Sequence, residues 1–228
     1  MPKRSRAIKI SDQKAEKGWL RKPRPHAYAE NPRTKNRSFL VVCEGQTEEQ
    51  YFKSFPVLTA TIKPFGIGSS KMALVKAVEK YKRNGSYDEI WCVFDLDFDP
   101  LVPGQYEDFN RAIQNAHALN YHCAYSNDAF ELWFVLHYQY LEQEHHRQDY
   151  FEMLGNRWGV NYIREGKSFR FANAIYSRLL NDHRANQSMA IEHARRLLAF
   201  HKDRPYHLQN PVTTAFQLVE RLNAHCRK

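Results

Sequence analysis

The chain has 228 residues, 43% of them hydrophobic, which suits one domain or one core domain with an appended lobe. It has no long uncharged apolar run, so we expect no membrane span, and the basic N-terminus lacks the apolar stretch of a secretory signal. The four cysteines are scattered, as expected for a reducing, cytoplasmic compartment.

Positive charge is concentrated in residues 1–37, which hold twelve Lys and Arg against three acidic residues. This excess equals the whole formal net charge of +9, so the rest of the chain is neutral. Residues 1–36 show no sustained period and include Pro23, Pro25 and Pro32, which predicts a basic, mostly irregular N-terminal arm. Such an arm favours binding to nucleic-acid phosphates; the alternative is a solvated tail that only aids solubility.

From residue 37 onward, strand-like and helix-like segments alternate. We predict strands at 37–43, 58–67, 89–95 and 121–125. We predict helices that begin at about Thr47, with a capping box to Gln50, and that cover 70–81 and 106–119. This alternation predicts an α/β core over 37–141, in which a mainly parallel sheet of about four strands is flanked by helices.

The second half of the chain has a helical pattern. An aromatic, amphipathic helix is predicted at 130–140, where it could serve an interface between copies of the chain. Further helices are predicted at 144–154, 170–181 and 189–201, and a last one is introduced by Asn210 as cap and Pro211. We therefore expect residues 142–228 to form a helical part that packs on the core.

Carboxylates follow two of the predicted strands. Glu44 comes after the first strand, and Asp95 and Asp97 end the third. Ligands of open α/β sheets bind at the carboxyl ends of the strands, and residues two apart in a strand share a face. Clustered carboxylates without cysteine or histidine favour a hard cation, so we predict a Mg²⁺ or Mn²⁺ site here. The Asp-x-Asp pattern alone is weak, since a solvated turn after a strand explains it equally well.

Other charged residues are secondary candidates for the same site. Asp99 is a further possible metal ligand. Glu48 lies in a first helical turn, where the helix dipole already favours acidic residues. Glu131 sits among aromatic residues and would be partly buried, either beside the metal or in a structural contact. Lys167 lies in a short basic segment that could hold a scissile phosphate; an ordinary solvated loop is the alternative.

Four stretches together resemble the RloB family, which is related to the AbiLii abortive-infection proteins. They are Cys43-Glu44-Gly45-x-Thr47-Glu48-x-x-Tyr51-Phe52, Asp95-x-Asp97, Ser126-Asn127 with Phe130-Glu131-Leu132-Trp133, and Asn210-Pro211-x-Thr213. The resemblance spans about 37–225 and departs from the usual family wording at Asp128, where proline is common. It implies a Toprim-like fold, in which Glu44, Asp95 and Asp97 match the residues that bind Mg²⁺ and carry phosphoryl-transfer chemistry.

The resemblance also implies a function. It suggests a nuclease effector of phage defence that works with an ATPase partner and cuts RNA, with tRNA as a candidate, rather than DNA. Two alternatives remain open. One is a nucleic-acid-binding subunit without turnover. The other is a haloacid-dehalogenase-like phosphatase, which the position of Asp95-Leu96-Asp97 on the third strand disfavours.

Overall fold

The computed structural model describes residues 37–66, 70–166 and 168–227, and Asn36–Lys228 forms one compact unit. The predicted basic arm, residues 1–36, lies outside the described residues, and so does Lys167. In the described ranges, no helix combines the length and the apolar character needed to cross a membrane.

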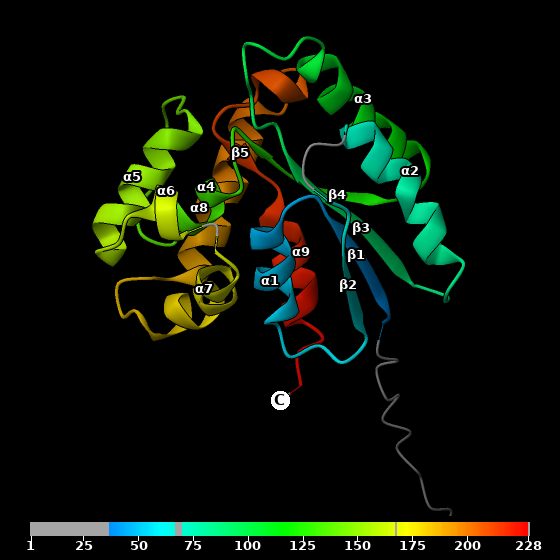
Figure 1. The fold of residues 1–228 in the computed structure, drawn as a ribbon, viewed down its shortest axis with the longest axis horizontal. Coiled ribbons are helices and arrows are strands. Elements are labelled where there is room, and N and C mark those ends of the chain that lie inside the picture. Colours follow the sequence, from blue (N-terminus) through cyan, green and yellow to red (C-terminus); the bar gives the residue numbers. More distant parts are fainter. Residues whose placement is uncertain (1–36, 67–69, 167, 228) are drawn as a thin grey trace, which may run out of the picture. The chain divides into compact units, whose positions relative to one another are not determined.

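A five-stranded sheet forms the centre of this unit (Figure 1). Its strands are, in spatial order, β2 (Ala60–Pro64), β1 (Phe39–Cys43), β3 (Glu89–Asp95), β4 (His122–Asn127) and β5 (Val212–Thr213). The first four are parallel, and β5 runs antiparallel to β4. All five residues of β1 are 0% exposed, which explains why its sequence is apolar without alternation. The predicted α/β fold is confirmed, with one strand more than expected.

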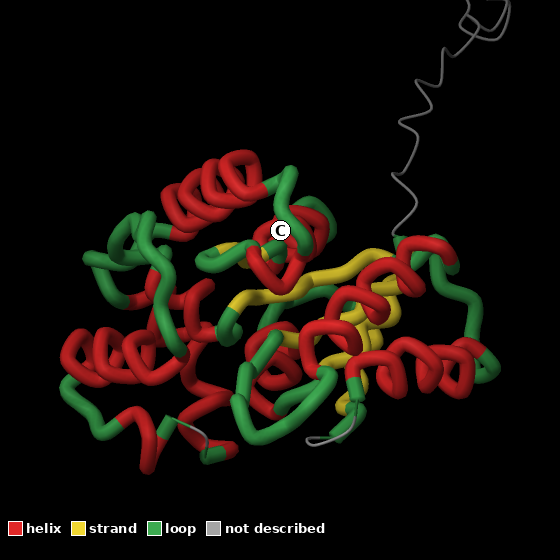
Figure 2. Tube along the Cα trace, turned by 90° about the horizontal axis from the view of Figure 1, so that it is seen from above, coloured by secondary structure: helices red, strands yellow, loops and turns green. Residues whose placement is uncertain are grey.

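Helices cover both faces of the sheet (Figures 1 and 2). The covering helices are α1 (Gln46–Lys53), α2 (Lys71–Lys82), α3 (Gln105–Ala118) and α9 (Ala215–Asn223). The chain moves from β1 to β2 in one direction, and from β2 past β1 to β3 and β4 in the other. Because such crossovers are right-handed, α1 lies on one face while α2 and α3 lie on the opposite face. The last helix, α9, contacts β4 on the face of α1, so it covers the sheet as predicted.

Helix α4 (Glu131–Val135) follows β4 within the core range, and the helical C-terminal part is also present. Besides α9, its elements are α5 (Arg147–Trp158), α6 (Tyr162–Glu165), α7 (Phe169–Asn181), α8 (Gln187–His201) and the short 3-10 helix η3 (Tyr206–Leu208). In this part α5 packs on α4, α7 packs on α1, and α8 packs against β5.

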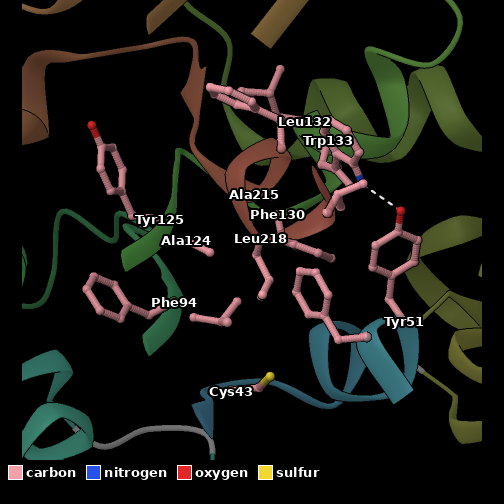
Figure 3. Close-up of a cluster of buried hydrophobic side chains, with 14 of the residues drawn as sticks. Cys43, Tyr51, Phe94, Ala124, Tyr125, Phe130, Leu132, Trp133, Ala215 and Leu218 are labelled. Carbon is pink, nitrogen blue, oxygen red and sulfur yellow. Dashed lines mark hydrogen bonds between the residues drawn. The ribbon is translucent and has the colours of Figure 1, made fainter. Parts of the chain in front are cut away.

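The core joins the sheet to the segment that follows β4. Figure 3 shows side chains from α1, the 130–133 segment and α9 meeting in one apolar cluster. Within it, the buried indole Nε1–H of Trp133 donates a hydrogen bond of 2.8 Å to the hydroxyl of Tyr51. The aromatic motifs that carry the family resemblance are therefore largely core residues.

The prediction of an amphipathic helix over 130–140 is wrong. Helix α4 ends at Val135, and the N–H groups of His137 and Tyr138 then donate to carbonyls three residues back, as in a turn. Every residue from Phe130 to His137 is buried, so the segment has no polar face and is not a free surface for an interface. Tertiary packing on all sides, rather than helical periodicity, decides its path.

Two predicted helix starts also differ. Helix α1 begins at Gln46 after Gly45 and has no side-chain cap, so the capping box at Thr47 is not formed. Asn210 and Pro211 precede strand β5 rather than a helix, and α9 begins only at Ala215. Pairing with the exposed edge of β4 satisfies backbone groups that a helix there would leave open.

Candidate active site

The ends of β1 and β3 place the two predicted acidic stretches side by side. These strands are neighbours in register, with Cys43 opposite Val93, and the Glu44 N–H donates to the Val93 carbonyl at 2.9 Å. From β1 the chain leaves to one side of the sheet, and from β3 to the other. Such a switch in direction opens a crevice at the carboxyl ends of the strands, which is where ligands of this architecture bind.

An acidic pocket of about 110 Å³ occupies this position. Its lining residues are Glu44, Gly45, Gln46, Thr47, Glu48, Asp95, Asp97, Glu131 and Phe151. Five of the predicted site residues are therefore brought together, from β1, α1, the end of β3 and α4. Asp99 is not among the lining residues, because its carboxylate accepts the Leu101 N–H at 2.9 Å in the following turn.

Asp95 and Asp97 converge, but not by strand alternation. Strand β3 ends at Asp95, and Asp97 has a φ of 52°, in the left-handed region that non-glycine residues seldom adopt. A backbone bond of 2.9 Å from the Asp97 N–H to the Asp128 carbonyl holds this turn. Asp95 is fixed separately, since its Oδ2 accepts the Phe130 N–H at 3.1 Å. A tight turn therefore aims the second carboxylate into the pocket.

Burial and mutual repulsion raise the pKa values of three carboxyl groups in the pocket, those of Glu44, Glu48 and Asp95. Burial, followed by repulsion from Glu131, Glu44 and Asp97, raises the pKa of Glu48 from 4.5 to about 8. Burial and the charge of Glu48 raise the pKa of Asp95 well above its usual value, and burial also raises the pKa of Glu44. Clusters of carboxylates with raised pKa values are typical of functional sites, because they are costly where nothing binds.

Two basic residues at the pocket were not predicted. Lys71 Nζ lies 2.6 Å from Glu44 Oε1, and Arg147 forms an ion pair with Asp97. Lys71 is the first residue of α2 and Arg147 the first of α5, positions at which the helix dipole disfavours a positive charge. An anionic partner offsets this cost, but the sequence does not show which anion lies beside each cation, so neither pair could be identified from it.

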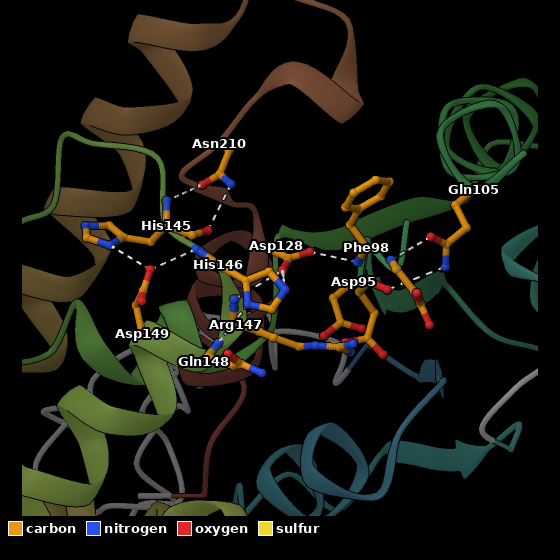
Figure 4. A network of polar contacts seen from close by, with 12 residues as sticks. Asp95, Phe98, Gln105, Asp128, His145, His146, Arg147, Gln148, Asp149 and Asn210 are labelled. Carbon is orange, nitrogen blue, oxygen red and sulfur yellow. Dashed lines mark hydrogen bonds and ion pairs between the residues drawn. The ribbon is translucent and has the colours of Figure 1, made fainter. Parts of the chain in front are cut away.

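A polar network fixes Arg147 beside the pocket (Figure 4). The carboxylate of Asp128 accepts the Phe98 N–H at 2.8 Å and the Arg147 N–H at 3.1 Å. Asp128, at the family position where proline is common, therefore ties the loop after β3 to the start of α5. Its role in this structure is to position Asp97 and Arg147 relative to each other.

The two explanations of Glu131 both apply in part. Glu131 is 5% exposed and lines the acidic pocket, as the metal-side explanation expects. It also accepts a hydrogen bond of 3.1 Å from the Tyr162 hydroxyl, which is a structural contact to α6. Glu131 thus connects the pocket to the helical C-terminal part.

The residue types that line the pocket fit a hard cation, although the carboxylate side chains would have to rearrange to bind one. The ligand set is entirely carboxylate oxygen, and Glu44 Oε2 is buried with no hydrogen-bond partner. Among the described residues, however, no group of three or more acidic, histidine or cysteine residues is placed to hold a metal as it stands. Lys71 and Arg147 compensate the charge instead, so an ion would have to displace these two pairs.

A family model described as RloB-like protein matches residues 39–222, which include every residue of the acidic pocket. The resemblance seen in the motifs is thereby confirmed. No curated protein and no solved structure matches the chain.

Proposed function

The chain belongs to the RloB-like family, and on that basis we propose that it is a metal-dependent nuclease. The observation that carries the proposal is the convergence of Glu44, Glu48, Asp95 and Asp97 at the switch point of a parallel sheet. The raised pKa values of Glu44, Glu48 and Asp95, together with the unpaired Glu44 oxygen, describe a cluster that a positive charge would stabilise. Mg²⁺ or Mn²⁺ would supply that positive charge, and the phosphate of a phosphodiester substrate would bind to it.

Glu44, Asp95 and Asp97 would hold the ion, which would lower the pKa of bound water and offset charge on the phosphate. The protein's own groups then position the substrate and move protons. Glu48, buried beside these ligands, would exchange a proton with the leaving oxygen. Lys71 and Arg147, once released from Glu44 and Asp97, place two positive charges beside the phosphate.

The substrate, partner and biological role rest on the resemblance to Toprim-like defence effectors. We propose RNA, with tRNA as a candidate, ahead of DNA, and an ATPase partner that controls an anti-phage activity. A cytoplasmic location belongs to the same proposal, and it agrees with four free cysteines, three of them buried inside strands.

The test is cleavage by the purified protein of total tRNA and of plasmid DNA, with Mg²⁺ or Mn²⁺ and with EDTA. We expect metal-dependent cuts that are lost in Asp95→Asn/Asp97→Asn. Asp99→Asn is a matched comparison from the same loop, and it should keep most of the activity because Asp99 lies outside the pocket lining. Cleavage that persists in EDTA or in the double variant would refute the proposal.

A nucleic-acid-binding subunit without turnover is the second candidate. One observation favours it: Lys71 and Arg147 already compensate two of the carboxylates without any ion. In that case neither polymer is cut, even after addition of an ATPase encoded next to this protein, while binding remains in the double variant.

A further inference from the structure

A second cavity lies against the acidic pocket and has a different chemistry. It has a volume of about 280 Å³, close to the lower limit of pockets that bind small ligands. We call it the aromatic cavity, and its characteristic lining residues are Leu96, Phe98, Tyr106, Asp128, Glu144 and His207. The function proposed above makes no use of it.

The loop after β3 separates the two cavities. Asp95 and Asp97 line the acidic pocket, whereas Leu96 and Phe98, between and after them, line the aromatic cavity. Asp128 belongs to the aromatic cavity and binds the backbone of both Phe98 and Arg147, whose side chain reaches Asp97 (Figure 4). A ligand in the aromatic cavity is therefore a direct neighbour of one held by the carboxylates.

Three stacked rings form one wall of the aromatic cavity. The rings of Phe98 and Tyr106 are 4.8 Å apart and inclined by 9°, and those of Tyr106 and His207 are 4.7 Å apart and inclined by 30°. Tyr106, in the middle, is covered by a ring on each face, so the faces on which a base can stack are those of Phe98 and His207 turned away from Tyr106. Ring stacks at a surface are the usual platform for unpaired nucleobases, because every base offers a flat π-face.

The platform is held rigidly. His207 Nδ1 pairs with the Asn110 amide at 2.7 Å, and its backbone N–H donates to Asn110 Oδ1 at 3.0 Å. Asn127 Nδ2 donates to the His207 carbonyl at 2.9 Å. These contacts fix η3 against α3 and β4, so the rings are ordered before any ligand arrives, which lowers the entropic cost of binding.

The charge of the cavity suits a neutral occupant better than a phosphate. In the part of the chain that the structure describes, its lining contains the carboxylates of Asp128 and Glu144 beside three histidines, and no Lys or Arg that would pair with a phosphate. A neutral, flat ring is not repelled by these carboxylates.

We propose that the aromatic cavity is a nucleobase subsite, which takes one unpaired base next to the scissile phosphate. The inference rests on the proposed nuclease function and adds to it a preference for single-stranded or looped substrate. Duplex bases are stacked and paired, so they cannot enter the cavity without being flipped out.

The experiment measures binding without cleavage. Asp95→Asn/Asp97→Asn in EDTA is titrated with a fluorescent single-stranded RNA oligonucleotide, followed by anisotropy. Adding Tyr106→Leu removes the ring that supports both Phe98 and His207, and the loss of this stacking platform should weaken binding roughly ten-fold. Tyr106→Phe should bind like the parent, and so should Phe200→Leu, which removes an exposed ring on α8, outside both cavity linings. Thermal melting of each variant checks that it folds.

An abasic residue walked along the oligonucleotide locates the base. At one position, the abasic residue should lower the affinity of the parent protein about as much as Tyr106→Leu does. At the same position it should not lower the affinity of the Tyr106→Leu protein further, because both changes remove the same stacking interaction. In the active protein this position should lie next to the cut. Equal affinity of the parent and Tyr106→Leu proteins would overturn the subsite and leave the nuclease intact. If the protein neither binds nor cuts any polynucleotide, both proposals fail.

Discussion

Replacing Glu48 by Gln should make the metal-free protein more stable at neutral pH. Glu48 is 5% exposed, and its folded-state pKa is about 8, against 4.5 for a free glutamate. Because the folded pKa is raised, the carboxyl stabilises the fold below pH 4.5 relative to higher pH, and this stability is lost as the pH rises through 8. At pH 7 the loss is about 3 kcal/mol. A neutral amide of the same size avoids it.

Urea denaturation in EDTA at pH 5, 7 and 8 tests this. The advantage of Glu48→Gln over the wild type should be below about 1 kcal/mol at pH 5 and about 3 kcal/mol at pH 7. Glu49→Gln is the matched control: Glu49 is equally buried on α1 but pairs with Lys53, so its loss should not stabilise the protein at any pH. The reasoning fails if Glu48→Gln is no more stable than the wild type at pH 7, or if its advantage is the same at pH 5.

Three further predictions concern stability. Burial lowers the pKa of His137 from 6.5 to about 4, so protonation should cost the fold about 2 kcal/mol between pH 7 and pH 5, and urea titrations of His137→Asn should lack this loss. Tyr51→Phe leaves the Trp133 indole N–H buried without a partner, which should cost about 1–3 kcal/mol in chemical denaturation. Lys71→Met leaves the Glu44 carboxylate unpaired, and should destabilise the protein by about 3 kcal/mol in EDTA. Millimolar Mg²⁺ should then raise the melting temperature of Lys71→Met more than that of the wild type; an equal rise would contradict the view that Lys71 and the ion compete for Glu44.

The succession of strands and helices along the chain follows from local residue patterns. The unbroken apolar run of β1 predicts a strand buried on both faces, and all of its residues are buried. Ser70 predicts the start of α2, where its side chain accepts the Ala73 N–H at 3.1 Å. These signals are carried by residues close together in the chain, so they can be read without knowing the fold.

Contacts between distant parts of the chain could not be predicted in the same way. The sequence placed Glu44, Asp95 and Asp97 at strand ends, and the parallel sheet then brought those ends together. The fold alone decided that Lys71 and Arg147 would compensate the carboxylates, because each pair joins segments separated by 27 and 50 residues. The same holds for β5 and for the 130–137 segment, whose conformations depend on the edge or the core against which they pack. Hydrophobic periodicity and caps act over a few residues, whereas ion pairs, edge pairing and complete burial depend on which surfaces the whole chain brings together.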